Sequence, residues 1–238
     1  PALVSRGFIC MKNVVIRAPI LSRSGYGEHS RQVFSYLLTK KNINVYTQVV
    51  PWGITPWYTN PDSCNGLIGE AIKRTATPDQ EFDISLQVML PNEWDTSAAK
   101  FNVGLTAGVE TDSCNPSWCA LDCNKMDLVI VPSEHTKKSF INSGGFSTQM
   151  EVVPEAYFEE LNNPVAEKLD LDLSTEFNFL TIGVLTGLSP ETDRKNLFYL
   201  IKWFMEEFHG DHEVGLIVKT NRGRETTIDK RITLQVLQ

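Results

Sequence analysis

Residues 13–50, NVVIRAPILSRSGYGEHSRQVFSYLLTKKNINVYTQVV, decide the fold class. The stretch begins with an apolar run over 13–19 and ends with another over 43–50, and both have the length of a strand. Between them, residues 28–41 place four apolar residues on one face of a helix: Val33, Phe34, Leu37 and Leu38. The stretch therefore predicts a unit of strand, helix and strand.

The same alternation continues along the rest of the chain. Helical patterns separate most of the later strand candidates, and one of them, 133–144, has Ser133 as its N-cap. Apolar strands that alternate with helices are typical of an α/β protein with a doubly wound parallel sheet, which we therefore predict. The later strand candidates are 82–88, 101–107, 126–133, 150–154, 177–185 and 214–220.

Composition changes once, in the polar and acidic segment EELNNPVAEKLDLDLSTE, residues 159–176. We interpret it as a linker and predict a first domain over 11–160, a linker over 161–176 and a second domain over 177–238. The second domain then has 62 residues, fewer than the roughly 100 to 150 that are usual. We expect it to be truncated, and Met11 to be the natural start.

Charge and hydropathy exclude several classes of protein. The formal net charge of −7 argues against a general nucleic-acid binder, which presents many Lys and Arg side chains on one face. No apolar run approaches the roughly 18 residues of a membrane span, and the N-terminus lacks a signal-peptide pattern. We therefore expect a cytoplasmic protein.

Five cysteines, an odd number, fit a reducing compartment. Cys119 and Cys123 are four residues apart and would share a helix face. They form no CxxC pair and have no histidine nearby at ligand spacing, so we predict buried thiols and no metal site.

Two glycines lie in the loop LSRSGYGEHSR, residues 21–31, which follows the first strand. Gly25 and Gly27 would let the backbone approach a ligand closely before the first helix. The loop lacks the third glycine of a dinucleotide fingerprint. A plain glycine turn, with Glu28 favouring the helix start, is the competing interpretation.

Two further loops carry candidate ligand groups. Glu110 and Asp112 follow the strand at 101–107, where carboxylates bind hydroxyls or act as acid or base, unless they only cap the helix near Pro116. The proline-bounded loop at 49–58 contains aromatic residues that stack on sugar rings or fold back as local packing. These residues are Trp52, Trp57 and Tyr58.

The stretch SPETDRKNLFYLIKWF, residues 189–204, predicts a helix entry with Asp193 as N-cap and with Arg194 and Lys195 behind it. Cations are unfavourable in the first turn of a helix, whose amino end carries partial positive charge. Either Asp193 and Glu191 neutralise them at a solvated surface, or a bound phosphate does.

Together, and in this order, the segments SGYGEHSR, VGLTAGVETDSCNPSW, DLVIVPSEHTKKSFINSGG, VVPEAYF and FLTIGVLTGLSPETDRKNLFYLIKWF resemble the glycosyltransferase group 1 family. Members are retaining enzymes of the GT-B fold, in which two Rossmann-like domains face each other. The resemblance implies a nucleotide-diphosphate sugar as donor substrate and no metal.

The resemblance also implies roles for single residues. Lys195, with Arg194 before it, matches the lysine that contacts the donor diphosphate. Gly25 and Gly27 match the glycine loop that closes over the donor phosphates and the acceptor. Glu110 lies near the position where many relatives have a histidine that touches the transferred sugar.

The sequence departs from the family pattern at two places. Val184 stands where many relatives have a phosphate-binding arginine, and Lys219 at the end of the next strand is a possible substitute. The late E-x7-E segment, which holds the donor sugar and ribose in relatives, does not occur in the predicted second domain, 177–238.

The resulting expectation is a sugar transferase that acts, with retention, on an acceptor hydroxyl of a glycan, lipid or protein. Trp52, Trp57 and Tyr58 are the acceptor-binding candidates. Two alternatives stay open: a non-catalytic nucleotide- or sugar-binding or assembly module, and another Rossmann-like nucleotide-sugar enzyme. The incomplete second sheet also predicts self-association.

Overall fold

The computed structural model describes residues 11–157, 162–163 and 171–237. The chain divides into two compact units, one of Pro1–Gly53 with Trp57–Leu161 and the other of Asn162–Gln238 with Ile54–Pro56. Half of the predicted linker, 161–176, lies outside the described residues, and so does the segment before Met11.

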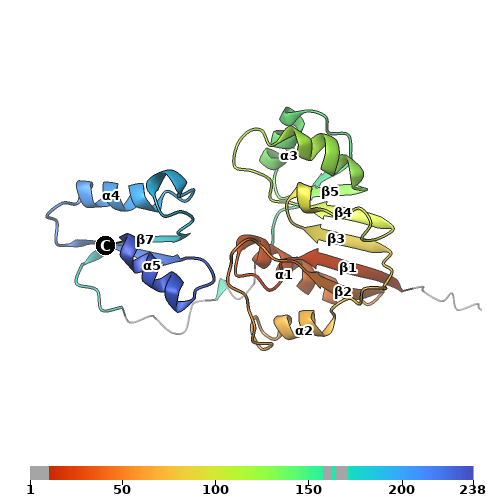
Figure 1. Cartoon of the computed structure of the whole chain (residues 1–238), viewed down its shortest axis with the longest axis horizontal. Helices are drawn as coiled ribbons and strands as arrows, with labels where there is room; N and C mark the ends of the chain where they lie inside the picture. The colour runs from red at the N-terminus through yellow and green to blue at the C-terminus, as the bar shows by residue number, and fades with distance from the viewer. Residues whose placement is uncertain (1–10, 158–161, 164–170, 238) are drawn as a thin grey trace, which may run out of the picture. The chain divides into compact units, whose positions relative to one another are not determined.

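Unit 1 is built on a six-stranded sheet in which every strand pair is parallel (Figure 1). The strand order is β2-β1-β3-β4-β5-β6, so the direction of winding reverses between β1 and β3. This arrangement confirms the predicted α/β class and parallel sheet and is consistent with a Rossmann-like fold. The strands are β1 (Lys12–Ala18), β2 (Ile43–Val49), β3 (Ile84–Val88), β4 (Phe101–Leu105), β5 (Leu128–Val131) and β6 (Met150–Val152).

The apolar strands of unit 1 form its core because helices cover the sheet. Three consecutive residues of β1, Val14, Val15 and Ile16, are buried, which requires both faces of that strand to be covered. Phe34 and Leu37 of the first helix pack into this core. The helices of unit 1 are α1 (Gly25–Leu38), α2 (Leu67–Lys73) and α3 (Glu134–Ser143).

Unit 2 contains two parallel strands, β7 (Phe177–Val184) and β8 (Val214–Asn221), and two helices, α4 (Leu197–Glu207) and α5 (Thr227–Leu237). Phe179 of β7 packs against Phe204 of α4 and against Phe208, the C-cap residue of α4, with ring centroids 5.9 and 5.5 Å apart. Helix α4 therefore covers one face of β7.

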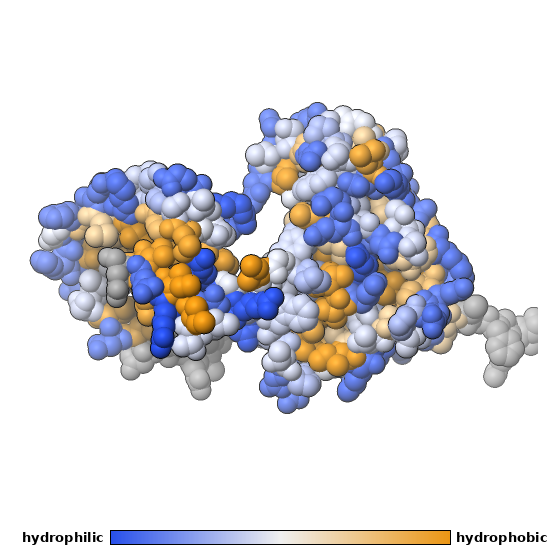
Figure 2. Space-filling view, in the orientation of Figure 1, coloured by the Kyte–Doolittle hydropathy of each residue, from blue (hydrophilic) through white to orange (hydrophobic). Residues whose placement is uncertain are grey.

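Apolar side chains also lie on the surface of unit 2. Leu180 and Ile182, which alternate with Phe179 and so lie on the other face of β7, are 61% and 66% exposed. Figure 2 shows an apolar stripe over α5, and Ile228 and Leu234 of that helix are largely exposed. Self-association through this surface stays a prediction.

Two helix starts differ from the sequence expectation. Helix α1 begins at Gly25, three residues early, because the Ser24 side chain accepts a hydrogen bond from the Gly27 amide and caps the helix there. Helix α4 begins at Leu197, so Asp193 is not its N-cap residue. That position belongs to Asn196, which has a left-handed backbone with φ of 59°.

The predicted absence of a membrane span agrees with the helices that the structure describes, since none of them is both long and apolar enough to cross a bilayer.

Candidate functional site

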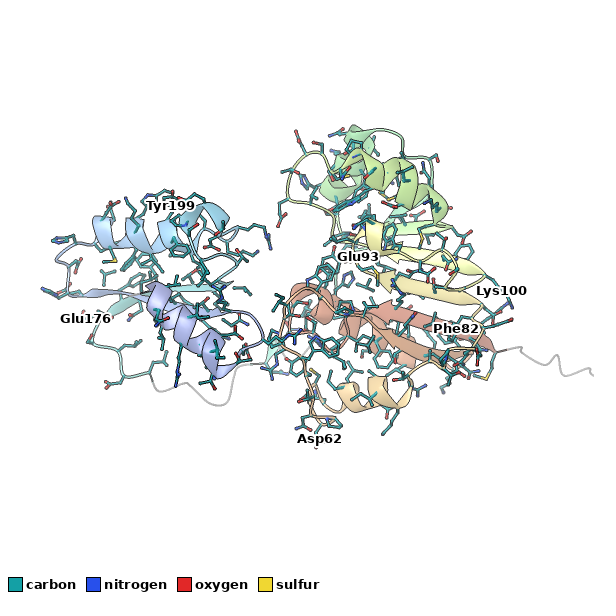
Figure 3. The ribbon with its side chains drawn as sticks, in the orientation of Figure 1. Asp62, Phe82, Glu93, Lys100, Glu176 and Tyr199 are labelled. Atoms are coloured by element: carbon teal, nitrogen blue, oxygen red, sulfur yellow. The ribbon has the colours of Figure 1, made fainter. Side chains whose placement is uncertain are left out.

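The loops that leave the carboxyl ends of the strands contain most of the predicted site residues of unit 1. In open α/β sheets, ligands bind beyond these ends, near the point where the winding reverses. Here that point lies between β1 and β3, next to the start of α1. Glu93, labelled in Figure 3, lies at this end of the sheet, and its carbonyl accepts a hydrogen bond from the Arg17 guanidinium at 2.7 Å.

Gly25 and Gly27 of the glycine loop, residues 21–31, have different roles. A Cβ atom at Gly27 would lie 2.0 Å from the carbonyl oxygen of Ser22, so this position requires glycine for packing within the protein rather than for access to a ligand. A Cβ atom at Gly25 would meet nothing within 4 Å. Gly25 is exposed at the first turn of α1, where backbone amides without helical acceptors favour an anion.

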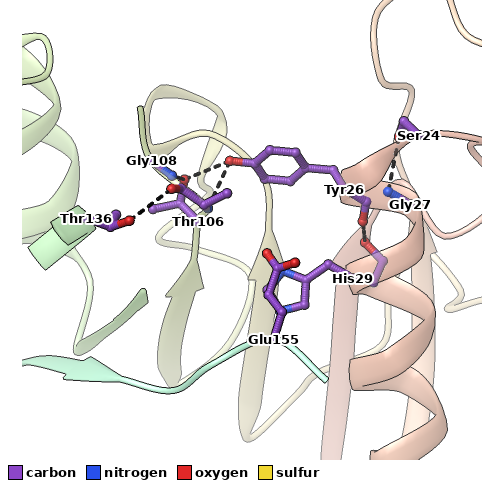
Figure 4. Close-up of polar contacts among 10 residues, drawn as sticks. Ser24, Tyr26, Gly27, His29, Thr106, Gly108, Thr136 and Glu155 are labelled. Atoms are coloured by element: carbon purple, nitrogen blue, oxygen red, sulfur yellow. Dashed lines mark hydrogen bonds and ion pairs between the residues drawn. The ribbon is translucent and has the colours of Figure 1, made fainter. Parts of the chain in front are cut away.

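Tyr26, between the two glycines, joins the start of α1 to the loop after β4 (Figure 4). Its hydroxyl lies 3.0 Å from Thr106 Oγ1 and accepts a hydrogen bond from the Ala107 amide at 3.1 Å. Thr106 Oγ1 also accepts from the Gly108 amide at 3.2 Å. Burial raises the pKa of Tyr26, although these hydrogen bonds oppose the shift, so the phenol stays protonated at neutral pH.

Two aromatic rings of the 49–58 loop contact the glycine loop, residues 21–31. Trp52 stacks on Tyr26, with ring centroids 4.0 Å apart and planes inclined by 24°. The Tyr58 ring lies under two guanidinium groups, those of Arg23 at 4.7 Å and Arg31 at 5.0 Å. Trp57, 41% exposed, presents the most surface of the three to an acceptor.

A half-buried histidine and a carboxylate lie beside this cluster. His29 Nδ1 is 3.3 Å from Glu155 Oε1, but outside hydrogen-bonding geometry. Burial lowers the pKa of His29, and the nearby Glu155 charge opposes the shift. His29 is therefore neutral at physiological pH, and its buried Nδ1 atom has no hydrogen-bond partner.

Glu110, the predicted catalytic residue, is exposed in the loop after β4. Asn115 caps the helical turn that follows this loop. Asn115 Oδ1 accepts hydrogen bonds from the amide and the hydroxyl of Ser117, at 3.0 and 2.9 Å, and so caps the turn that begins at Pro116. The loop of Glu110 and the glycine loop are connected by Tyr26.

In unit 2, Asp193 organises the loop after β7. Its carboxylate accepts hydrogen bonds from the Leu197 amide at 2.7 Å, the Thr186 hydroxyl at 2.8 Å and the Lys195 amide at 3.3 Å. Burial alone would raise the pKa of Asp193, but these hydrogen bonds outweigh it and lower the pKa. Asp193 thus satisfies the α4 amino end from outside the helix.

The same arrangement corrects the expected position of the two cations. Arg194 and Lys195 precede α4 instead of occupying its first turn, and both are exposed. Lys219 pairs in register with Ile182, on the face of the sheet away from α4, and two residues before β8 ends. Arg194 and Lys195 therefore lie together, and Lys219 lies on the other face of the sheet.

A hollow of about 350 Å³, lined by residues 80–82 and 97–100, lies at the opposite end of the unit 1 sheet. Phe82 and Lys100, labelled in Figure 3, lie just before β3 and β4 begin. The hollow is thus remote from the predicted site residues, and the general position of ligands in such sheets disfavours it.

The cysteines agree with the prediction of buried thiols, since Cys119 and Cys123 are both fully buried. Within the described ranges, no group of three or more His, Cys, Asp or Glu side chains is placed to hold a metal ion.

Sequence reasoning missed four residues of this cluster: Tyr26, His29, Thr106 and Glu155. The flanking glycines were a signal for Tyr26, because an aromatic residue between two glycines at a helix start has little local packing of its own. Nothing local marked Thr106, which is 80 residues away from Tyr26. Against known proteins, neither the family models nor the curated proteins give a match to this chain.

Proposed function

We propose that this chain is part of a retaining glycosyltransferase of the GT-B type, which moves a sugar from a nucleotide diphosphate to an acceptor hydroxyl without a metal. The observation that supports it most is the pair Arg194 and Lys195 in the loop after β7, whose backbone amides donate to the Thr186 hydroxyl and the Asp193 carboxylate respectively. Cations beside a helix start suit a departing diphosphate.

In this proposal the loops of unit 1 serve the acceptor side. Gly25 offers an open backbone at the start of α1, and Glu110 lies in the loop that Tyr26 ties to it. Trp57 supplies exposed aromatic surface, whereas Trp52 and Tyr58 shape the loop from within. The acceptor is a hydroxyl-bearing glycan, lipid or protein.

The test is the binding of nucleotide-diphosphate sugars with uracil, guanine and adenine bases to the 238-residue chain, measured by calorimetry. A hydrogen bond to a charged group contributes about 1.5 to 3 kcal/mol, so Lys195→Ala should weaken binding about 10- to 150-fold. Lys202→Ala, which removes an exposed α4 lysine paired with Glu206, is the matched control and should leave binding unchanged.

Two results would contradict the proposal. The first is that the wild-type chain binds none of these donors at millimolar concentration. The second is that Lys195→Ala and Lys202→Ala bind equally well, which would make Lys195 a solvated surface residue.

A further inference from the structure

Two thiols meet in the segment between β4 and β5. The Sγ atoms of Cys114 and Cys119 are 3.7 Å apart. Cys114 is half-buried in the irregular loop that also carries Glu110, whereas Cys119 is fully buried in the π-helical turn Trp118–Asp122. No role in sugar transfer calls for either thiol.

We propose that Cys114 and Cys119 are an oxidation site, a thiol pair that hydrogen peroxide converts to a disulfide. A disulfide has its sulfurs about 2.05 Å apart, so these two must approach by about 1.7 Å from their present 3.7 Å. We expect Cys114 to make this movement, because Cys119 lies in a helical turn and its thiol donates to the Phe140 carbonyl at 3.4 Å.

The environment decides which sulfur reacts first. Burial and the neighbouring Cys114 raise the pKa of Cys119 to about 12, so Cys119 remains a thiol. Cys114 is the more accessible of the two, and the Ser143 hydroxyl lies 3.3 Å from its sulfur. Reaction with peroxide therefore begins at Cys114.

The chemistry balances in two steps. The Cys114 thiolate attacks one peroxide oxygen, the O–O bond breaks, and the products are a sulfenic acid and hydroxide, which takes up the thiol proton as water. Cys119 Sγ then attacks Cys114 Sγ, the S–O bond breaks, and the leaving hydroxide departs as water with the Cys119 proton. Two thiols and one peroxide give one disulfide and two waters, and peroxide is the species reduced.

The bond would constrain the loop of the candidate site. It closes a short ring from Cys114 to Cys119 at the end of the loop that carries Glu110. The Cys114 amide already donates to Ser143 Oγ of α3 at 2.8 Å, so the oxidised loop has two fixed points. Disulfides in a reducing compartment are usually transient and redox-sensing.

The experiment treats the reduced full chain with peroxide, alkylates the remaining thiols and digests it with trypsin without reduction. The tryptic peptide 101–125 contains Cys114, Cys119 and Cys123. We expect it to become lighter by two hydrogens and to carry one alkyl group instead of three, and a dithiol should reverse this. Cys114→Ala should abolish the change and Cys123→Ala should preserve it.

Three outcomes would overturn the proposal. In the first, Cys114→Ala still loses two thiols, which assigns the bond to Cys119 and Cys123. In the second, the peptide keeps three alkylatable thiols at a peroxide dose that oxidises the half-buried Cys64. In the third, Cys114 gains oxygen atoms without forming a bond. Cys114→Ala removes a half-buried side chain, and circular dichroism confirms its fold before treatment.

Discussion

Removing one oxygen atom from Tyr26 tests the connection between the glycine loop and the loop after β4. In Tyr26→Phe the Ala107 amide loses its acceptor and Thr106 Oγ1 loses one partner, while the stack on Trp52 is kept. A buried donor left without a partner costs about 1 to 3 kcal/mol. We therefore expect unit 1 to lose about 1 to 3 kcal/mol of unfolding free energy, and the Ala107 amide to exchange faster.

Tyr36→Phe is the matched control, because Tyr36 is on the same helix but 61% exposed. It should change the unfolding free energy by less than about 0.5 kcal/mol. Urea-dependent hydrogen exchange of unit 1 peptides measures both variants without a contribution from unit 2. Equal stability of Tyr26→Phe and wild type, with unchanged exchange at Ala107, would show that the hydroxyl holds neither loop in place.

The remaining predictions concern four other positions. Gly27→Ala should destabilise unit 1 by about 1 to 3 kcal/mol in urea unfolding, because its Cβ would meet the Ser22 carbonyl, whereas Gly25→Ala should be neutral or stabilise by up to about 1 kcal/mol; equal effects would refute the assigned packing. Burial lowers the pKa of His29 in the folded chain. Below about pH 6.5, His29 therefore takes up a proton more readily in the unfolded chain than in the folded chain. Stability should fall as pH falls through this range, and His29→Gln should flatten the fall; parallel profiles would contradict the assignment. Asp193→Ala should lower the unfolding free energy of unit 2 by about 1 to 3 kcal/mol and speed amide exchange at the start of α4, and unchanged exchange there would show that the Asp193 carboxylate does not hold this helix end.

The strands of unit 1 were predictable because a parallel sheet covered on both faces needs apolar runs, and β1 shows one directly in Val14, Val15 and Ile16. The start of α1 was harder to predict from the sequence. Gly25 and Gly27 favour a loop by propensity, but the Ser24 cap starts the helix at Gly25, and the close approach of Ser22 leaves no room for a side chain at Gly27.

The candidate site was predictable in its loops but not in its contacts. Arg194 and Lys195 were found from local charge, whereas the helix start behind them depends on an Asp193 carboxylate that reaches four residues forward to Leu197. Tyr26 and Thr106 meet only after the sheet has formed, so no local pattern indicates their contact. Pairs of this kind require the tertiary structure.

Neighbouring residues of the loop after β7 have different roles. Asp193 is buried and its carboxylate accepts hydrogen bonds from the backbone of the turn, while Arg194 and Lys195 are exposed and each donates a backbone amide to it. These hydrogen bonds at the start of α4 join the Asp193 carboxylate and the Thr186 hydroxyl to backbone amides, which every residue except proline supplies. The charge at Lys195 can therefore be changed to suit a different anion while these backbone hydrogen bonds are kept.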